Sequence, residues 1–381
     1  MGEVKNWASI LDDNTRRQAD MLSHAPGIAG HVALMPDAHL GKGATVGSVI
    51  PTHLDTIIPA AVGVDIGCGM IAVRLNKTRE DLPEDLPPLV LLFERSIPAG
   101  VGREHKGGGG HARARRTAQW FHDNPIPNAE NLDLERAKRQ LGTLGSGNHF
   151  VEVCIDTEER VWVVLHSGSR GIGNNIAGMF IRRAKDENTE TLEDRDLAGL
   201  RGPTFEQYID MMEWAQHYAY TNREFMMDAA MADVKGLVDS VQQEERINCH
   251  HNFAAREVHF GKEVWITRKG AIKADTGDMG VIPGSMGAAT YITSGLGNPE
   301  AYRSSAHGAG RRYSRGAARR TFSVESLNEQ MEGKAWNRNH AKALLDEHPE
   351  AYKPIDQVME DQKDLTRIVH TLHQIVNYKG T

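Results

Sequence analysis

The chain has 381 residues, 40% of them hydrophobic and 25% charged, a balance typical of a globular protein with a large core. Its formal net charge of −7 excludes binding of nucleic acid through overall basicity, so a polyanion would need local basic patches. Three widely spaced cysteines argue against a disulfide framework, and no apolar run approaches the roughly 18 residues of a membrane span. A cytoplasmic location is therefore expected.

Neither a repeat, a linker nor a low-complexity segment divides the sequence, so one compact domain over residues 1–381 is favoured over two. Hydrophobic periodicity predicts helices over residues 13–22, 134–141, 175–185, 204–238 and most of 354–378. It predicts strands over residues 31–36, 70–75, 148–154 and 161–165, and a strand pair around residues 260–262. The Met, Trp, Tyr and Phe stripe in 204–238 indicates core packing rather than a cofactor site.

Several polar groups follow directly on predicted strands. The first is a loop after residues 31–36 that carries Asp37, His39 and Lys42, which are candidates for catalytic or positioning groups or only a polar turn. An apolar run, 57–64, which is expected to form a buried strand, then leads into the glycine-rich turn that holds Asp65 and Cys68. A carboxylate and a thiol three residues apart suit a borderline divalent ion better than Ca²⁺ or Mg²⁺, although a capped turn with a small buried cysteine is the plainer interpretation.

Basic residues are concentrated in two segments of the chain. Residues 100–116 combine glycines with Arg, Lys and His, which is typical either of an RNA-contacting loop or of a mobile solvated one. Residues 304–315, with Arg319 and Arg320 beyond, form the densest basic stretch of the chain. A third element, the Gly/Ser turn of residues 167–174, offers backbone amides that with Arg170 could hold a phosphate.

A set of potential ligands recurs at turns and strand ends: Asp65, Cys68, His149, His166 and His251, with His307 set among small neighbours. Any one of these histidines alone is more often structural than a ligand. Their repeated placement at strand ends favours a metal centre.

The motifs that carry these residues resemble the RtcB family of GTP- and manganese-dependent RNA ligases. The similar stretches are residues 35–43 (MPDAHLGKG), 64–69 (VDIGCG), 145–150 (GSGNHF), 165–171 (LHSGSRG), 249–252 (CHHN), 283–287 (PGSMG), 307–311 (HGAGR) and Lys379–Gly380. The resemblance implies a mixed α/β single-domain fold with central sheets that carry a dinuclear metal site in a cleft. It also implies an enzyme that joins RNA ending in a 3′-phosphate or 2′,3′-cyclic phosphate to RNA with a 5′-hydroxyl, in tRNA splicing or RNA repair.

By the same resemblance, two Mn²⁺ ions are held by Asp65, Cys68, His149, His166 and His251, with Cys68 shared. His307 is the histidine that takes GMP from GTP. The guanosine and its phosphate are implied to contact Asn148, Phe150, Glu152, Ser285, Thr290, His307, Gly308, Gly310, Tyr352 and Lys379. The sequence departs from the family pattern at Ala306 and Thr290, where serines are usual.

Arg170, Arg311 and Arg315 are further candidates for holding phosphate, since guanidinium binds phosphate bidentately. Two other classes stay open: a metal-dependent phosphodiesterase or phosphatase, and a metal-stabilised RNA-binding protein without turnover. The expected partners are RNA ends, with an archease-type activator and no membrane, and the expected state is a monomer.

Overall fold

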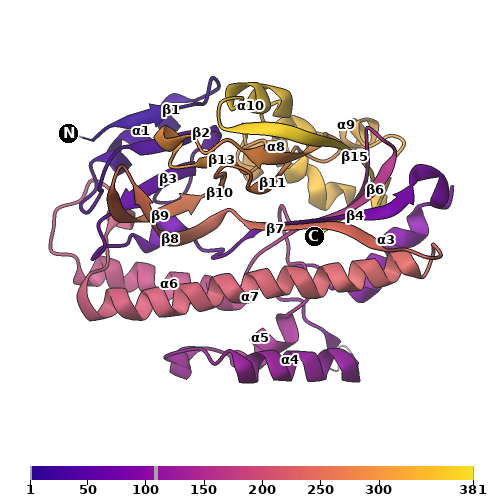
Figure 1. Ribbon diagram of the computed structural model, residues 1–381, viewed down its shortest axis with the longest axis horizontal. Helices are drawn as coiled ribbons and strands as arrows, with labels where there is room; N and C mark the ends of the chain where they lie inside the picture. The colour runs from indigo at the N-terminus through magenta and orange to yellow at the C-terminus, as the bar shows by residue number, and fades with distance from the viewer. Residues whose placement is uncertain (1, 107–109, 381) are drawn as a thin grey trace.

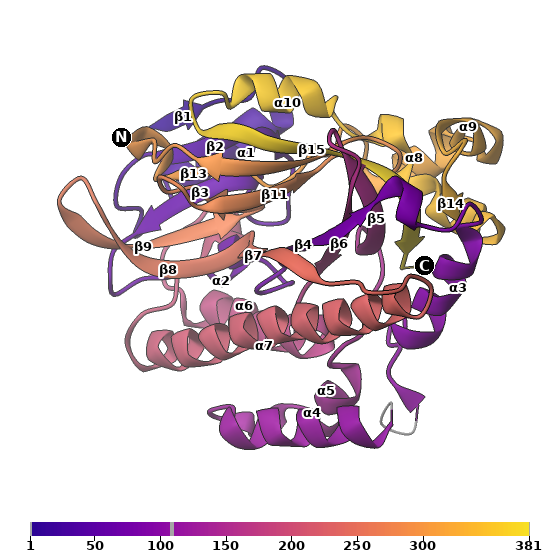
Figure 2. The same cartoon turned by 45° about the vertical axis from the view of Figure 1, so that its right-hand side comes forward.

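The computed structural model describes residues 2–106 and 110–380. Gly107, Gly108 and Gly109 of the predicted basic loop lie outside the described residues, as do Met1 and Thr381. The fold is mixed α/β, as expected (Figures 1 and 2). The one-domain organisation stays a prediction.

Within the described residues the strands form an eight-stranded, a five-stranded and a two-stranded sheet. The path of the largest sheet is β11-β12-β15-β5-β6-β4-β7, with β14 beside β15, and that of the second is β1-β2-β3-β9-β8. The strands are β1 Val4–Asn6, β2 Val32–His39, β3 Val46–Thr52, β4 Gly69–Thr78, β5 Phe150–Asp156, β6 Arg160–Ser167, β7 Gln243–His250, β8 Asn252–His259, β9 Lys262–Lys269, β10 Ala271–Lys273, β11 Met279–Pro283, β12 Thr290–Gly295, β13 Ser304–Ala306, β14 Ala335–Trp336 and β15 Thr366–Lys379.

Helix α7 runs along one side of the sheets, with α4 and α5 beyond it on the side away from them (Figures 1 and 2). The α-helices are α1 Asp13–Ser23, α2 Pro59–Val62, α3 Pro87–Ser96, α4 His111–Asp123, α5 Leu134–Gln140, α6 Arg170–Glu187, α7 Gly202–Lys235, α8 Arg315–Thr321, α9 Val324–Gln330 and α10 Ile355–Asp361. A longer 3-10 segment, η6, spans Arg338–Glu347. No described helix is both long and apolar enough to cross a membrane.

The apolar run in β6 reflects burial of both faces of the large sheet. Val161, Val163 and Leu165 pack in a core with α3 and α7, whereas Trp162 and Val164 pack in a second core on the other face. A strand covered on both faces has no solvent side, so its sequence does not alternate between apolar and polar residues. The predicted helices over 13–22, 134–141, 175–185 and 204–238 and the predicted strands are confirmed.

The predicted helix over most of residues 354–378 is wrong. Only Ile355–Asp361 is helical, and Thr366–Lys379 forms β15, which pairs with β5 on one side and β12 on the other. Its β-branched and aromatic content and its alternation indicate a strand: Leu372, Gln374, Val376 and Tyr378 are all buried.

Three smaller expectations also need correction. Asp37 and His39 lie inside β2, not in a loop after it, because the strand continues through Pro36 to His39. The run before the Asp65 turn contains the short helix α2 rather than a strand. Part of the basic segment 100–116 is helical, since α4 begins at His111.

We expect Leu372→Ala to lower the free energy of unfolding by about 2–5 kcal/mol, because its side chain is fully buried in β15 between two paired strands. Urea denaturation measures the loss. The matched control is Ile368→Ala in the same strand, whose residue is 46% exposed and whose change should stay within about 0.5 kcal/mol. Equal losses in the two variants would contradict the central placement of Leu372.

Candidate active site

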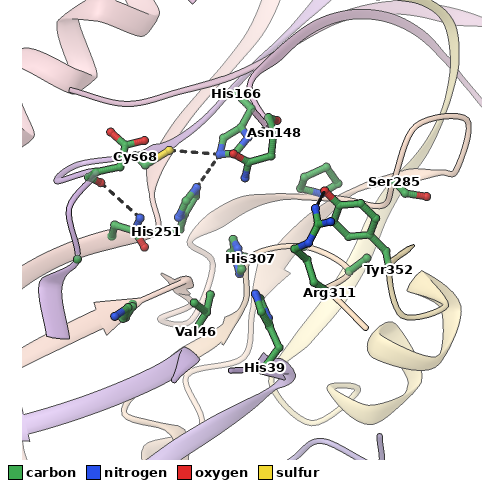
Figure 3. Close-up of a pocket in the computed structure, with 18 of the residues that line it drawn as sticks. His39, Val46, Cys68, Asn148, His166, His251, Ser285, His307, Arg311 and Tyr352 are labelled. Carbon is green, nitrogen blue, oxygen red and sulfur yellow. Dashed lines mark hydrogen bonds between the residues drawn. The ribbon is translucent and has the colours of Figure 1, made fainter. Parts of the chain in front are cut away.

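A cavity of about 360 Å³ opens where the ends of several strands meet. The register of the large sheet brings these ends together: Gly69 of β4 pairs with Ser167 of β6 and with His250 of β7, and Phe150 of β5 pairs with His166. Residues distant in the sequence therefore reach one edge of the sheet. In Figure 3, His307 lies between Cys68, His166 and His251 on one side and Arg311 and Tyr352 on the other.

Potential metal ligands form two groups that share one thiol. Cys68, His166 and His251 make up one group, and Asp65, Cys68 and His149 the other, with the ligand atoms of each group within 4.8 Å of one another. The Cys68 Sγ lies 3.4 Å from Nε2 of His149 and 3.3 Å from Nε2 of His166. One carboxylate, one thiol and three imidazoles are thus aimed at a small volume.

Backbone carbonyls fix which nitrogen of two of these histidines points inward. The Nδ1 of His149 donates to the Leu144 carbonyl at 2.9 Å, and the Nδ1 of His166 donates to the Asn148 carbonyl at 3.0 Å. In the neutral form of either ring, Nε2 then carries the lone pair with which imidazole binds a metal.

The electrostatics of this cluster also suit a cation. Burial lowers the pKa of His166 and of His251 well below the usual range, so both rings are neutral. Their Nε2 atoms nevertheless lie 2.8 Å apart, and the buried Nδ1 of His251 has no hydrogen-bond partner among the described residues. Convergent lone pairs at this distance fit a bound cation better than they fit one another.

The thiol belongs to the same arrangement. Burial, and next the Asp65 carboxylate, raise the pKa of Cys68 well above its ordinary value. A cation would offset this cost because it favours the thiolate. The residues present therefore fit a mixed sulfur, nitrogen and oxygen metal site, of the kind that borderline divalent ions occupy.

Two polar residues of α7 hold the loops that carry these ligands. Arg223 is fully buried and donates through Nη1 to the carbonyls of Gly67, at 2.8 Å, and Ser167, at 3.1 Å. Asn222 accepts from the amide of Gly142 at 2.6 Å and donates to the Gly168 carbonyl at 3.1 Å. The pair thus fixes three loops from one helix.

The lack of a side chain at Gly168 leaves room for the Asp65 carboxylate. A Cβ at this position would lie 2.1 Å from Oδ1 of Asp65, a separation that real atoms do not reach. The turn at Ser169 also donates its amide to that oxygen, at 3.2 Å. A side chain at 168 would therefore displace the carboxylate of the ligand group.

His307 is positioned by a buried carboxylate. The Oδ2 of Asp37 lies 2.5 Å from Nδ1 of His307 and accepts from the His307 and Gly308 amides at 3.0 and 3.3 Å. Within residues 2–106 and 110–380, no group hydrogen-bonds Nε2 of His307, whose ring lies 4.7 Å from that of His251. A nitrogen nucleophile is thus placed beside the five candidate metal ligands, which we call the metal-type cluster: Asp65, Cys68, His149, His166 and His251.

The cavity has a second part on the opposite side of His307 from the candidate metal ligands. We call it the Glu347 lobe, because its polar side chains surround the buried carboxylate of Glu347. This carboxylate accepts from Arg315 at 2.7 Å, Tyr352 at 2.6 Å and Arg311 at 3.2 Å, and it pairs with Lys379 at 3.1 Å. Burial alone would raise the pKa of Glu347, but Lys379 and the two arginines lower it to about 2. The glutamate is therefore ionised and fixes four donors around one pocket.

Glu152 has the opposite character. Burial raises its pKa to about 8, although the nearby charge of Lys379 and a 2.7 Å hydrogen bond from Asn377 oppose the shift. The Lys379 ammonium lies 5.4 Å from the centre of the Phe150 ring. This lobe therefore offers an aromatic face, a fixed ammonium donor and a buried carboxyl that titrates near neutrality.

The comparisons identify the family. The model of the family described as "tRNA-splicing ligase RtcB" matches residues 18–380, nearly the whole chain. The chain belongs to the RtcB family. It is 43% identical to the RNA-splicing ligase RtcB of Escherichia coli K12 over 99% of this chain and 97% of that one. It is also 32% identical to the tRNA-splicing ligase RtcB of Pyrobaculum aerophilum, with 92% and 87% covered, and 31% identical to the RNA-splicing ligase RtcB of Mycobacterium tuberculosis, with 93% and 98% covered.

The structure brings together most of the residues that the RtcB resemblance implies. Those lining the cavity are Asp65, Cys68, Asn148, Phe150, Glu152, His166, His251, Ser285, His307, Gly308, Gly310, Tyr352 and Lys379. His149 reaches Cys68 from a second cavity that also contains Arg170. Thr290 does not line the cavity: it is fully buried at the start of β12.

The Gly/Ser turn around Arg170 is predicted from its residues to offer free amides to a phosphate. Two of these amides are engaged within the protein, since the Ser169 amide donates to Asp65 and the Gly171 amide to Gln140. A phosphate contact of Arg170 stays a prediction. Arg311 and Arg315 do line the cavity. Sequence reasoning missed Glu347, Asn222 and Arg223, although a polar Asn-Arg pair within the apolar stripe of α7 was a usable signal.

We expect Cys68→Ala to remove most bound divalent metal while the fold persists, because Cys68 is common to both ligand groups. Mass spectrometry of metal content after dialysis against Mn²⁺ gives the readout, and circular dichroism monitors folding. Cys154→Ala, which removes a buried thiol outside these groups, is the matched control and should keep its metal. Unchanged metal in Cys68→Ala would refute the role of the thiol.

Proposed function

We propose that the chain is an RNA ligase that uses GTP to join RNA ending in a 3′-phosphate or 2′,3′-cyclic phosphate to RNA with a 5′-hydroxyl. The names of the relatives, RNA-splicing and tRNA-splicing ligases, support an RNA ligase. The observation that carries the proposal is His307: its Nδ1 is held by Asp37, and its ring lies between the metal-type cluster and the Glu347 lobe.

His307 supplies the nucleophile in this proposal. With Nδ1 donating to Asp37, the Nε2 lone pair attacks the α-phosphorus of GTP, so that a P–N bond forms and the bond to pyrophosphate breaks. The carboxylate of Asp37 stabilises the positive charge that develops on the ring. An oxygen of the RNA 3′-phosphate then displaces His307, which breaks the P–N bond and gives a 3′-pp-5′-G end. The 5′-hydroxyl of the second RNA attacks this end, expels GMP and leaves a phosphodiester.

The Glu347 lobe is the proposed guanosine pocket. Phe150 offers a face for stacking, and Lys379, which is positioned by its contact with Glu347, offers a donor to an acceptor such as the guanine O6. The Glu152 carboxylate would accept from the guanine N1 and N2 groups. Adenine presents neither this acceptor nor this pair of donors, which supports GTP over ATP as the substrate.

Two Mn²⁺ ions are proposed for the site, one held by Cys68, His166 and His251 and the other by Asp65, Cys68 and His149. When bound, they would neutralise charge on the departing pyrophosphate and activate the water that opens a cyclic phosphate. A hydrolase would need such ions but neither an Asp37-held histidine nor a base pocket, so ligation is favoured.

We further propose that the chain forms one domain, is a monomer and is located in the cytoplasm. We also propose that it works with an archease-type activator and acts in tRNA splicing or RNA repair.

We expect Asp37→Asn to slow transfer of label from α-labelled GTP to the protein by about 100-fold or more, because an amide no longer favours the Nδ1–H form of His307 or its charged product. Affinity for GTP should change by less than about twofold. His307→Ala should take no label yet seal some RNA that is already activated as 3′-pp-5′-G. Full joining of unactivated RNA by His307→Ala would refute the covalent step.

A second expectation concerns pH. Glu152 is protonated below its pKa of about 8, whereas the guanine edge favours its ionised form, so guanine binding must release a proton below that pH. Affinity should rise by about tenfold per pH unit up to roughly pH 7 and level off above pH 8. Calorimetry with guanosine, which has no titrating phosphate, gives the profile. Glu152→Gln should bind more weakly with a flat profile, and a sloping profile in that variant would exclude Glu152 as the group responsible.

A further inference from the structure

Three arginines follow one another at intervals of four residues, and the first two line the cavity. Arg315 and Arg319 lie on the same face of α8, and Arg311 precedes the helix by one such step. We call Arg311, Arg315 and Arg319 the arginine row. Four residues advance about 6 Å along a helix, so Arg315 and Arg319 are separated by about 6 Å along the axis of α8.

The arginine row leads outward from the proposed guanosine pocket. The exposed fraction of the side chain rises from 15% at Arg311 to 43% at Arg315 and 57% at Arg319. The first two line the cavity, and a Cβ on Gly147, beside the ligand-bearing loop, would lie 3.1 Å from Nη2 of Arg315. The row therefore connects the reactive centre with the protein surface.

Two adjacent buried acidic residues, Asp346 and Glu347, bind the arginines of the row. Arg311 donates to the Asp346 carbonyl at 2.5 Å, Arg315 donates to the Asp346 carboxylate at 2.8 Å, and the other oxygen of that carboxylate lies 3.3 Å from Arg319. Asp346 is only 4% exposed, so it orients the guanidinium groups without covering their outer sides. The Glu347 carboxylate is shared further with Lys379.

The row carries an excess of positive charge. Three arginines and Lys379 face the carboxylates of Asp346 and Glu347, which leaves cations in excess of anions. Arg320, exposed at the next position of α8, adds a cation that has no ion-pair partner among the residues the structure describes. In a chain of net charge −7, such a local excess is what a polyanion would need.

We propose that the arginine row, extended by Arg320, binds consecutive backbone phosphates of the RNA strand whose 3′-phosphate enters the cavity. The inference rests on the proposed ligase function. That 3′-phosphate must reach GMP on His307, so the nucleotides before it leave the cavity past Arg315, which lines it, toward the more exposed Arg319. Guanidinium groups held in a fixed orientation bind phosphate oxygens through charge-assisted hydrogen bonds that do not depend on the base.

The test compares two double variants with the same loss of charge. Arg319→Gln/Arg320→Gln removes the outer cations, and Arg16→Gln/Arg17→Gln removes an adjacent exposed pair on α1, which packs against β2. Fluorescence anisotropy measures binding of a 3′-phosphorylated RNA 20-mer, a 3′-phosphorylated dinucleotide and a 20-mer with a 5′-hydroxyl and no 3′-phosphate, in Mn²⁺ without GTP and over a range of salt concentrations.

The dissociation constant for the 3′-phosphorylated 20-mer should rise about tenfold in Arg319→Gln/Arg320→Gln, and the slope of log affinity against log salt should shrink by about 1 to 2. The dinucleotide is too short to reach Arg319, so its binding should stay the same, as should binding of every RNA to the α1 variant. Equal losses in the two double variants, an unchanged 20-mer affinity, or a loss confined to the 5′-hydroxyl strand would each overturn the proposal.

Labelling by α-labelled GTP separates this inference from the proposed function, because that step needs no RNA. Absence of label on the wild-type protein would refute the GTP-dependent mechanism, whereas the anisotropy series would still decide whether the row binds the 3′-phosphorylated strand. Labelling of Arg319→Gln/Arg320→Gln within about twofold of wild type is expected if these side chains act on RNA alone. A much larger loss would count against the proposal.

Discussion

The arrangement of the site depends on two adjacent side chains in the middle of α7. Arg223 binds the carbonyls of the Asp65 turn and of the end of β6, while Asn222 binds the loop before β5 and the Gly168 carbonyl. Buried backbone groups without hydrogen bonds are costly, so these contacts stabilise the loops as well as placing them. Because all the contacts come from one rigid helix, ligands that are distant in the sequence keep a fixed mutual geometry.

The two lobes of the cavity differ in how burial is compensated: one contains candidate ligands suited to a cation, and the other contains an ionised carboxylate surrounded by donors. On the metal side, burial keeps His166 and His251 neutral and the Cys68 thiol protonated, so these three residues gain most from binding a cation. On the other side, the Glu347 carboxylate is ionised because Lys379 and the other donors around it lower its pKa. His307 joins the two lobes, with Asp37 fixing its tautomer from a third element, β2.

The sequence indicated the candidate metal ligands better than it indicated the residues that hold the site in place. Ligands at strand ends are visible as polar residues after apolar runs, which is why Cys68, His166 and His251 could be named before the structure was known. Glu347 could not, because an acidic residue in a 3-10 segment looks like ordinary surface until three cations from elsewhere surround it. The C-terminal strand was mistaken for a helix because its short apolar runs fit either period, and only pairing with β5 and β12 decides between them.

The position of β15 affects how the chain acquires its fold during translation. Strand β5 ends at Asp156, but its neighbour β15 begins at Thr366, so roughly 200 residues are made between the two. At about 5–20 residues per second, the nascent chain presents the open edge of β5 for roughly 10 to 40 seconds. An unpaired edge is a template for pairing with other chains, so during this interval the exposed edge of β5 is open to association with other polypeptides.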